Sequence, residues 1–381
     1  MSIYFITFLL TCVSTKFAES TKKKIYQIIF SFFAILIPSL LAGLRSYEIG
    51  TDVEVYILPL FQLARLSENF SDYLSAHWFY VWRYINVTDY EPGFIALIYF
   101  TTKFFDNLSI VLLVIHILII TPLYVALFRL RDYYPVWLGM LVFFLSGFNN
   151  SLNLMRQYIA MSFVLLGFSY LIKQDTKKYF YFVFIASLFH TSAIMGLLIY
   201  FIFFFINQEK KYKKMRLGKK LFNIKIFRVV FLALCFLLVL FSSNLLVFLL
   251  DTIGLEEYSN YLYGDVKFLP NQLLFRLPIF FIFIINWKKL KRKDSNIYFY
   301  WALLIMDLLF AQLASVYEQS GRIGYYFSQF SMLSYPLLIT SQSRRINKVI
   351  LSLFIISYLF LFWFFNFAWL GRTETVPYIF L

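Results

Sequence analysis

Six ionisable side chains lie at or near the ends of apolar segments: Arg45, Asp52, Glu91, Arg156, His190 and Arg322. Ionisable groups in such positions are costly, so each of them is a functional candidate. Guanidinium forks bind phosphate oxygens bidentately and stay charged, so arginines at helix starts favour a pyrophosphate site. Carboxylates and histidine supply a base for an attacking hydroxyl. Together these residue types predict a site that binds a lipid diphosphate and stabilises the leaving pyrophosphate.

Most of these residues also have a structural interpretation. Arg45 could be an interfacial arginine and His190 an interface histidine without a ligand. Asp52 could cap a helix, and Glu91 could begin one. Arg322 could form a structural ion pair with Glu318. Arg156 is harder to explain structurally, because it follows Asn149-Asn150-Ser151 and begins a long apolar helix. The aromatic run at residues 77–82 is typical of an interfacial belt, with stacking on sugar rings as the alternative.

The elements that carry these residues belong to a membrane protein. Of 381 residues, 61% are hydrophobic and only 14% are charged. Soluble domains carry about a quarter of charged residues, which argues against a water-soluble globule, a disordered chain and a nucleic-acid binder. Cys12 and Cys235 lie in apolar runs and build neither a disulfide framework nor a metal site. We expect an all-α polytopic fold with about twelve transmembrane helices, re-entrant or short half-helices, and no soluble domain.

Residues 1–381 are expected to form a single integral membrane domain, and the basic clusters set its orientation. The clusters that belong in the cytoplasm lie at residues 16–24, 173–178, 207–225, 288–293 and 344–348. Acidic or mixed segments that belong outside lie at 45–89, 251–265, 317–321 and 367–381. This assignment gathers the six ionisable residues at the outer face and places both termini outside. Asp307, about halfway along an apolar segment at 297–316, is the deep exception.

Two segments are too short for full crossings. Residues 179–206 lie between cytoplasmic clusters, and two crossings need about 40 residues. We therefore expect a short helical hairpin with His190-Thr191-Ser192 at its tip; the alternative, one long tilted helix, conflicts with the charge assignment. Residues 91–105 open with Glu91-Pro92-Gly93 and fit a re-entrant or tilted half-helix.

Four short patterns follow one another between about residues 40 and 200. They are Ala42-Gly43-Leu44-Arg45 followed by Gly50-Thr51-Asp52 and Tyr56; Tyr90-Glu91-Pro92-Gly93-Phe94; Asn153-Leu154-Met155-Arg156-Gln157 with Ala160; and Ala186-Ser187-Leu188-Phe189-His190-Thr191-Ser192-Ala193. In order and spacing they resemble the motifs of the EpsG-type branch of the Wzy-like bacterial polysaccharide polymerases. The second half of the chain matches loosely, through Arg322 and Val376-Pro377-Tyr378.

The resemblance implies a glycosyltransferase of the inner (plasma) membrane that works at its outer face. Such enzymes transfer a growing glycan from undecaprenyl pyrophosphate to a hydroxyl of the next lipid-linked repeat unit, in O-antigen, capsule or exopolysaccharide biosynthesis. No metal or other cofactor is implied, and the partners would be the lipid-linked oligosaccharide, the bilayer and a chain-length regulator, with no nucleic acid. We assign Arg45, Arg156 and Arg322 to the pyrophosphate, Asp52, Glu91 and His190 to base or acceptor positioning, and Gln157 and Tyr56 to substrate binding.

Two other functions compete with this interpretation. A transporter, such as a lipid-linked oligosaccharide flippase or an ion-coupled carrier, should show broken helices at the midplane and paired halves. Here only Asp307 is deep, which favours an enzyme. The nearer alternative is a related membrane ligase or acyltransferase. An acyltransferase would need a histidine next to an acidic residue, and His190 has no such neighbour in sequence.

Overall fold

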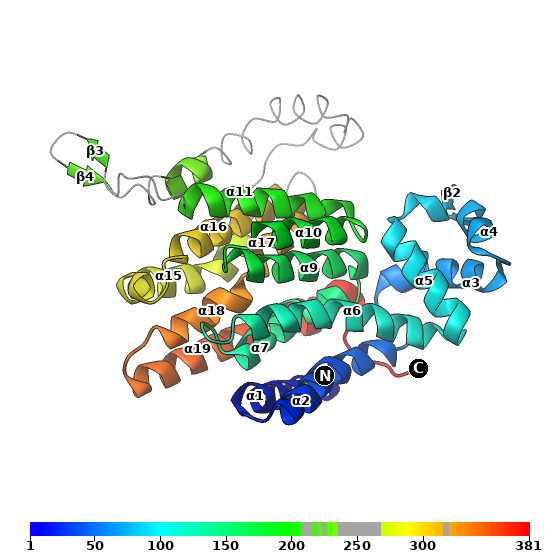
Figure 1. Ribbon diagram of the computed structural model, residues 1–381, viewed down its shortest axis with the longest axis horizontal. Helices are drawn as coiled ribbons and strands as arrows, with labels where there is room; N and C mark the ends of the chain where they lie inside the picture. Colours follow the sequence, from blue (N-terminus) through cyan, green and yellow to red (C-terminus); the bar gives the residue numbers. More distant parts are fainter. Residues whose placement is uncertain (208–214, 218–219, 223–225, 227, 235–267, 315–319) are drawn as a thin grey trace. The chain divides into compact units, whose positions relative to one another are not determined.

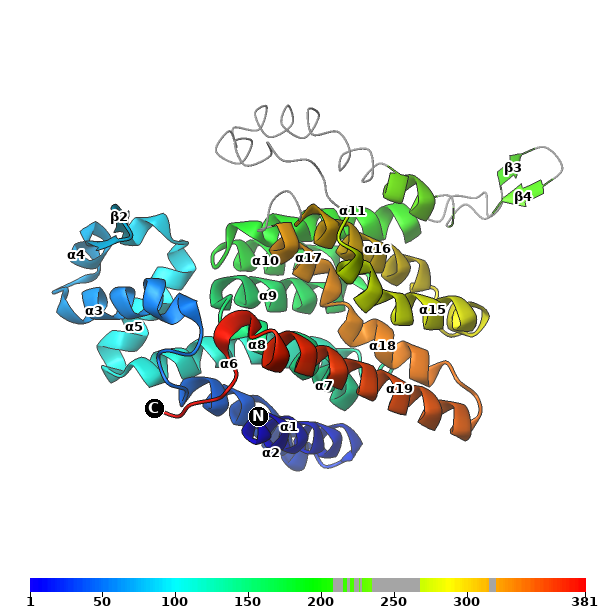
Figure 2. The same ribbon diagram turned by 180° about the vertical axis from the view of Figure 1, so that it is seen from behind.

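The computed structural model describes residues 1–207, 215–217, 220–222, 226, 228–234, 268–314 and 320–381, and these are mostly helical (Figures 1 and 2). The chain divides into two compact units, one formed by Met1–Ile194 with Val349–Leu381 and the other by Met195–Lys348. Most of the basic loop at 207–225, the acidic loop at 251–265, Cys235 and Glu318 lie outside the described residues.

The first unit is built around the helix α6 (Leu108–Arg129). Both α2 (Lys24–Gly43) and α9 (Met155–Leu171) pack against α6, as Figure 1 shows. Their outer neighbours are α1 (Ser2–Ser20) against α2, α7 (Val136–Ser146) against α1, and α10 (Thr176–Ser187) against α9. The site helix α9 is therefore buried on two sides, and it can hold a side chain at its start in a fixed position.

Helix starts in this unit follow from local sequence. Asn107 caps α6 by accepting a hydrogen bond from the Ile110 amide at 3.2 Å, and Asp175 caps α10 in the same way. Helix α5 (Pro92–Phe105) begins with proline at its first position, directly after Glu91. Its 14 residues span about 21 Å, less than the hydrocarbon core, as expected for a half-helix.

The segment between α2 and α5 is more structured than the loop that the sequence indicated. It contains the π-helix η1 (Val53–Ile57), α3 (Leu58–Leu66), α4 (Phe70–Ser75) and the 3-10 turn η2 (Val87–Asp89). Strands β1 (His77–Tyr80) and β2 (Arg83–Asn86) form an antiparallel hairpin. The described residues are otherwise mainly helical, as expected, and this short hairpin is an addition that arises because a run of aromatic residues favours extended backbone.

The end of the chain returns to the residues that follow α2. After α19 (Arg345–Trp363), the π-helix η4 (Phe364–Trp369) and the turn η5 (Arg372–Glu374), the tail reaches Arg45 and forms a bridge with it through Phe380. The Ser46 amide donates to the Ile379 carbonyl at 2.8 Å. The tail and the segment that begins at Arg45, both expected outside, thus lie together.

The second unit contains α11 (Met195–Asn207), α15 (Pro270–Lys293), α16 (Ile297–Leu313), α17 (Ser320–Ser328) and α18 (Ser331–Thr340). A second short hairpin joins β3 (Met215–Leu217) to β4 (Lys220–Phe222). Asp307 of α16 forms a bidentate ion pair with Arg276 of α15, at 2.6 and 3.1 Å. The deep carboxylate therefore has a structural partner that the sequence interpretation did not assign.

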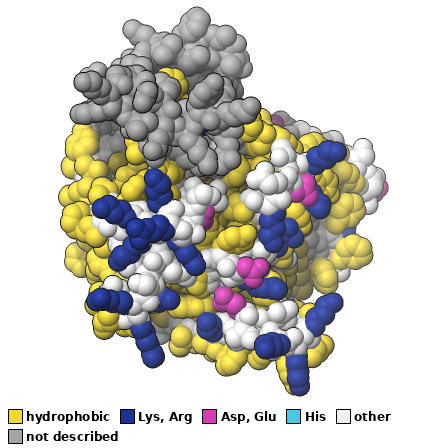
Figure 3. Space-filling model, turned by 60° about the vertical axis from the view of Figure 1, so that its left-hand side comes forward, with side chains coloured by type: hydrophobic (Ala, Val, Ile, Leu, Met, Phe, Trp, Pro, Cys, Tyr) yellow, Lys and Arg dark blue, Asp and Glu magenta, His cyan; other side chains and the backbone are white. Residues whose placement is uncertain are grey.

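Among the described helices, three are long and apolar enough to cross a membrane: Lys24–Gly43, Leu108–Arg129 and Arg345–Trp369. Shorter apolar helices accompany them, so the expected twelve crossings are not confirmed. Large hydrophobic side chains such as Phe32 and Leu361 are exposed on these helices, as lipid-facing residues would be. Figure 3 shows Lys and Arg side chains gathered on one face and bordered by hydrophobic surface.

Candidate active site

The centre of the candidate site is an ion pair between Glu91 and Arg156. Glu91 directly precedes α5, and Arg156 is the second residue of α9. The Arg156 Nη1 atom lies 2.6 Å from Glu91 Oε2, and the two side chains are 22% and 10% exposed. Hydrogen bonds between two charged groups are short and strong, and this one is largely shielded from solvent. The structure thus joins two candidate residues that are 65 positions apart in the sequence.

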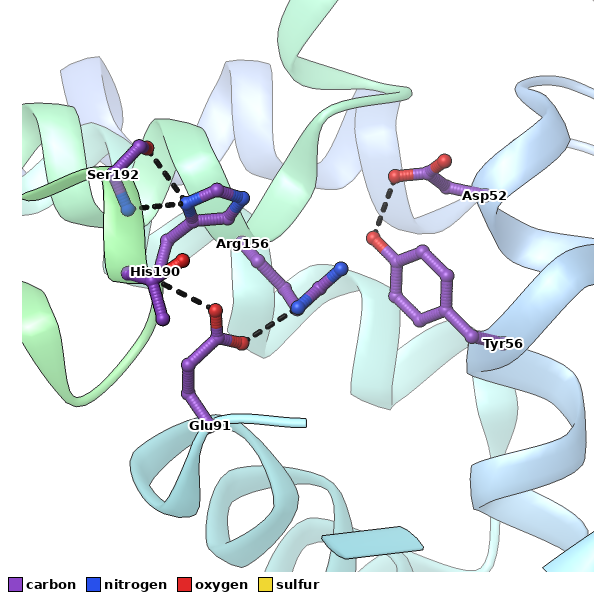
Figure 4. A network of polar contacts seen from close by, with 7 residues as sticks. Asp52, Tyr56, Glu91, Arg156, His190 and Ser192 are labelled. Carbon is purple, nitrogen blue, oxygen red and sulfur yellow. Dashed lines mark hydrogen bonds and ion pairs between the residues drawn. The ribbon is translucent and has the colours of Figure 1, made fainter. Parts of the chain in front are cut away.

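His190 lies in the turn that adjoins this pair (Figure 4). Helix α10 ends at Ser187 and the 3-10 turn η3 (Thr191–Ile194) follows, so the helix break falls where the hairpin tip was expected. The Thr191 amide donates to Glu91 Oε1 at 3.0 Å. The Ser192 amide donates to His190 Nδ1 at 3.0 Å, which places the proton of a neutral ring on Nε2.

Gly93 explains why the start of α5 can approach this turn so closely. Its amide donates to the Leu188 carbonyl at 2.8 Å. A Cβ atom on Gly93 would lie 2.7 Å from that carbonyl oxygen, too close for an alanine without a backbone shift. The glycine of the Glu91-Pro92-Gly93 motif therefore brings Glu91 within reach of both Thr191 and Arg156.

Aromatic rings surround the Arg156 guanidinium. Its central carbon lies 4.7 Å from the Tyr90 ring centre, 5.0 Å from that of Tyr56 and 6.0 Å from that of Phe94. Within the described part of the chain, the buried Arg156 Nε has no hydrogen-bond partner. Rings hold a guanidinium by cation–π attraction without using its N–H donors. Arg156 is therefore positioned while retaining a donor for an anionic ligand.

Asp52 enters the same network through Tyr56. The Tyr56 hydroxyl donates to Asp52 Oδ2 at 2.6 Å, and Figure 4 shows Tyr56 lying between Asp52 and Arg156. Burial, and next the Asp52 charge, raise the pKa of Tyr56 well above its ordinary value. The phenol therefore stays protonated and keeps donating to the carboxylate.

Asn153 fixes the loop that carries Asp52, a role that the sequence interpretation missed. Its side-chain oxygen accepts from the Asp52 amide and from the Thr51 hydroxyl, both at 3.0 Å. Gly50, at φ +87°, has backbone that an L side chain rarely adopts, and a Cβ there would lie 2.9 Å from the Leu152 carbonyl oxygen. The motif residues Gly50 and Asn153 thus lock the loop onto the start of α9.

Arg45 is completely buried and bound to backbone. Its Nη1 donates to the Ala42 carbonyl at 3.1 Å and its Nη2 to the Leu152 carbonyl at 2.8 Å. Burial lowers the pKa of Arg45 to about 10, which still leaves it charged at neutral pH. Its guanidinium connects the end of α2 to Leu152 in the turn before α9, directly before Asn153, which holds the Asp52 loop.

The EpsG family model matches residues 28–380, which include every site residue described above. The chain belongs to the EpsG family. This is a Wzy-like polysaccharide polymerase family, so membership gives a general role in polysaccharide polymerisation in a membrane. No curated protein and no solved structure matches the chain. The match also takes in the second half, where the sequence motifs gave only loose agreement.

The remaining assigned residues are Arg322 and Gln157. Arg322 is an exposed residue of α17, which belongs to the second unit. Gln157 follows Arg156 on α9 and is buried, with 4% of its surface exposed. In the described part of the chain, no group of three or more His, Cys, Asp or Glu residues is arranged to hold a metal ion.

Burial of Arg45 in this EpsG-family chain leads to a prediction about stability. We expect Arg45→Ala to lower the free energy of unfolding by about 2–5 kcal/mol, because it leaves two buried carbonyls unpaired and a cavity behind. Thermal unfolding of the detergent-solubilised chain measures the effect. Arg65→Ala is the control, since Arg65 pairs with Asp106 on an exposed surface. Unchanged stability in Arg45→Ala would contradict a structural role.

Proposed function

We propose that this EpsG-family chain is a membrane glycosyltransferase that polymerises oligosaccharide repeat units linked to undecaprenyl pyrophosphate, at the outer face of the inner (plasma) membrane. One observation carries the proposal. The Arg156 guanidinium lies between Glu91 and Tyr56, with His190 and Asp52 on either side (Figure 4). This arrangement combines a fixed cation for a leaving pyrophosphate with proton acceptors for an incoming hydroxyl.

Arg156 is the proposed contact of the leaving group. It lies in the first turn of α9, where the helix dipole also favours an anion. Negative charge develops on the pyrophosphate as its bond to the sugar breaks, and a cation that is already in place stabilises this charge without reorganisation. With Nδ1 accepting from the Ser192 amide, a neutral His190 ring would carry its proton on Nε2.

Asp52 is the proposed base. Glu91 is neutralised by Arg156 and also accepts from the Thr191 amide, while His190 accepts at Nδ1 from Ser192. Asp52, in contrast, is paired with the neutral Tyr56 hydroxyl. We therefore assign the base to Asp52, which faces the Arg156 side of the site through Tyr56, and Glu91 acts as the positioning residue for Arg156.

The reaction follows from these roles. An acceptor hydroxyl oxygen forms a bond to the anomeric carbon of the donor glycan, and its proton passes to Asp52. The bond between that carbon and the pyrophosphate oxygen breaks, and undecaprenyl pyrophosphate leaves with the electron pair. Arg322 and Gln157 remain proposed substrate contacts, the former for pyrophosphate. A separate chain-length regulator is a further proposed partner.

Reconstitution tests the proposed function. We expect the purified chain in proteoliposomes to convert undecaprenyl-pyrophosphate-linked repeat units into a ladder of longer glycans, with one undecaprenyl pyrophosphate released for each linkage. Gel separation of the glycans and chromatography of the lipids measure both products. Movement of intact repeat units across the bilayer without new linkages would instead identify a transporter. Transfer of the glycan only to a different added acceptor would identify a ligase.

A further inference from the structure

The β1–β2 hairpin has two different faces. The register of the two strands places Trp78 opposite Ile85 on one face and Phe79 opposite Tyr84 on the other. Trp78 is half-buried and Ile85 is buried, so their face is directed toward the protein. Phe79 and Tyr84 are 58% and 68% exposed, and their rings meet edge to face at 5.2 Å. The hairpin therefore presents an aromatic ridge to its surroundings.

The inner face of the hairpin connects directly to the candidate active site. The Trp78 ring stacks on Tyr90, with ring centres 5.8 Å apart, and Tyr90 in turn covers the Arg156 guanidinium. The Trp78 indole N–H is buried and has no hydrogen-bond partner among the described residues. Aromatic packing thus runs from the proposed pyrophosphate contact to the inner face of the hairpin.

The turn of the hairpin shows backbone strain that favours exposure of one side chain. Val81 and Trp82 both have positive φ, at 45° and 67°, although turns of this kind prefer Asn and Gly. A positive φ is especially unfavourable for a β-branched residue such as Val81. Trp82 is nevertheless 91% exposed. Strained backbone often marks a functional position. Here the strained turn holds the Trp82 indole ring in an exposed position.

The charge of the segment around the hairpin favours a glycan over a lipid surface as the partner that binds the exposed aromatic rings. Residues 67–90 contain one Lys or Arg side chain, Arg83, and three acidic ones, Glu68, Asp72 and Asp89. Segments that bind anionic membrane surfaces carry an excess of Lys and Arg, and this segment carries an excess of acidic residues instead. Neutral sugars are not repelled by such an acidic segment, and the faces of pyranose rings stack on exposed aromatic rings.

We propose that the β1–β2 hairpin binds the glycan of the lipid-linked substrate, with Phe79, Tyr84 and Trp82 stacking on its sugar rings. This inference rests on the proposed polymerase function: the stack from Trp78 through Tyr90 to Arg156 fixes the inner face of the hairpin beside the proposed pyrophosphate contact, while Phe79 and Tyr84 lie on the exposed face. A glycan whose pyrophosphate contacts Arg156 would extend along the hairpin. The hairpin thereby retains the growing chain between successive transfers.

Polymer length tests the inference. In the proteoliposome reaction, we expect Trp82→Ala and Tyr84→Ala to shorten the mean polymer by about fivefold to tenfold, because each variant removes one exposed aromatic ring on which a sugar would stack. Tyr133→Ala is the control, because Tyr133 is 52% exposed and lies outside the hairpin. Wild-type polymer length in both hairpin variants would overturn the inference.

Two further measurements distinguish the alternatives. Relative to Trp82→Ala, Trp82→Phe should restore polymer length, because phenylalanine can stack on a sugar ring. Trp82→Leu should not restore it, because leucine is apolar but cannot stack. Equal polymer length in both variants would identify a membrane anchor and overturn glycan binding. In parallel, calorimetry measures binding of the repeat-unit oligosaccharide, released from its carrier by mild acid, to the full-length chain in detergent. Weaker binding in Tyr84→Ala supports the inference even if the wild-type chain makes no polymer, and unchanged binding overturns it.

Discussion

We expect Arg156→Ala to lower the rate of glycan polymerisation by about 10²–10³-fold or more, with single repeat units accumulating on the lipid carrier. The reason is that Arg156 is the one cation that the described contacts place between the Glu91 carboxylate and the Tyr56 ring. Its loss removes the charge that stabilises the leaving pyrophosphate, and it also leaves Glu91 uncompensated. The rate of the first coupling in proteoliposomes measures the effect.

The variant Arg156→Lys distinguishes the effect of the positive charge on the coupling rate from the effect of the planar guanidinium shape. Lysine keeps the positive charge but lacks the planar fork, so we expect a loss of about tenfold or more if bidentate phosphate contact matters. Arg65→Ala serves as the matched control, because it also breaks an arginine–carboxylate pair, but on an exposed surface. Polymer of wild-type length and amount in Arg156→Ala would remove Arg156 from the site.

Three neighbouring residues of the candidate site could be selected from the sequence because they lie at discontinuities of helices. Glu91 precedes a helix, Arg156 begins one and His190 lies in a break between two. Such positions are recognisable from proline, glycine and polar runs within apolar sequence. Their mutual contact still depended on tertiary packing: only the structure shows that Gly93 lets α5 approach the turn at Leu188.

Arg45 shows where sequence reasoning reaches its limit. An arginine two residues after an apolar helix fits a headgroup contact, a phosphate ligand or a buried structural residue equally well. Burial arises here from residues far along the chain, because the bridge between Arg45 and Phe380 brings the tail over it. Asn153 was missed for a related reason: its partner, the Asp52 loop, is 101 residues away.

The fold was predicted at the level of class but not in its details. Apolar composition indicates membrane helices reliably, whereas the number of crossings depends on helix length and tilt, which short apolar segments do not determine. The segment at 45–89 was interpreted as an outer loop because of its charges. It nevertheless forms short helices and a hairpin, since Leu60, Ala64 and Tyr73 find burial within the unit.

Asp52→Asn is expected to reduce the coupling rate by about 10²–10⁴-fold, the range typical of losing a general base. Asparagine keeps the size of the side chain and can still accept from the Tyr56 hydroxyl, so the loop should remain folded. The backbone contact with Asn153 is also retained, because it uses the Asp52 amide. The measurement is the coupling rate in proteoliposomes, combined with thermal unfolding to show that stability is unchanged.

Two variants distinguish a base from a general charge effect. Glu54→Gln removes one carboxylate from the same turn, but Glu54 is exposed, so we expect a rate within about twofold of wild type. Tyr56→Phe deletes the donor to Asp52 and should cost about tenfold or less, because the carboxylate itself remains. A rate in Asp52→Asn equal to that of Glu54→Gln would exclude Asp52 as the base. In that case His190 would take its place as the proton acceptor, through the tautomer with the proton on Nδ1, which requires the Ser192 contact to break.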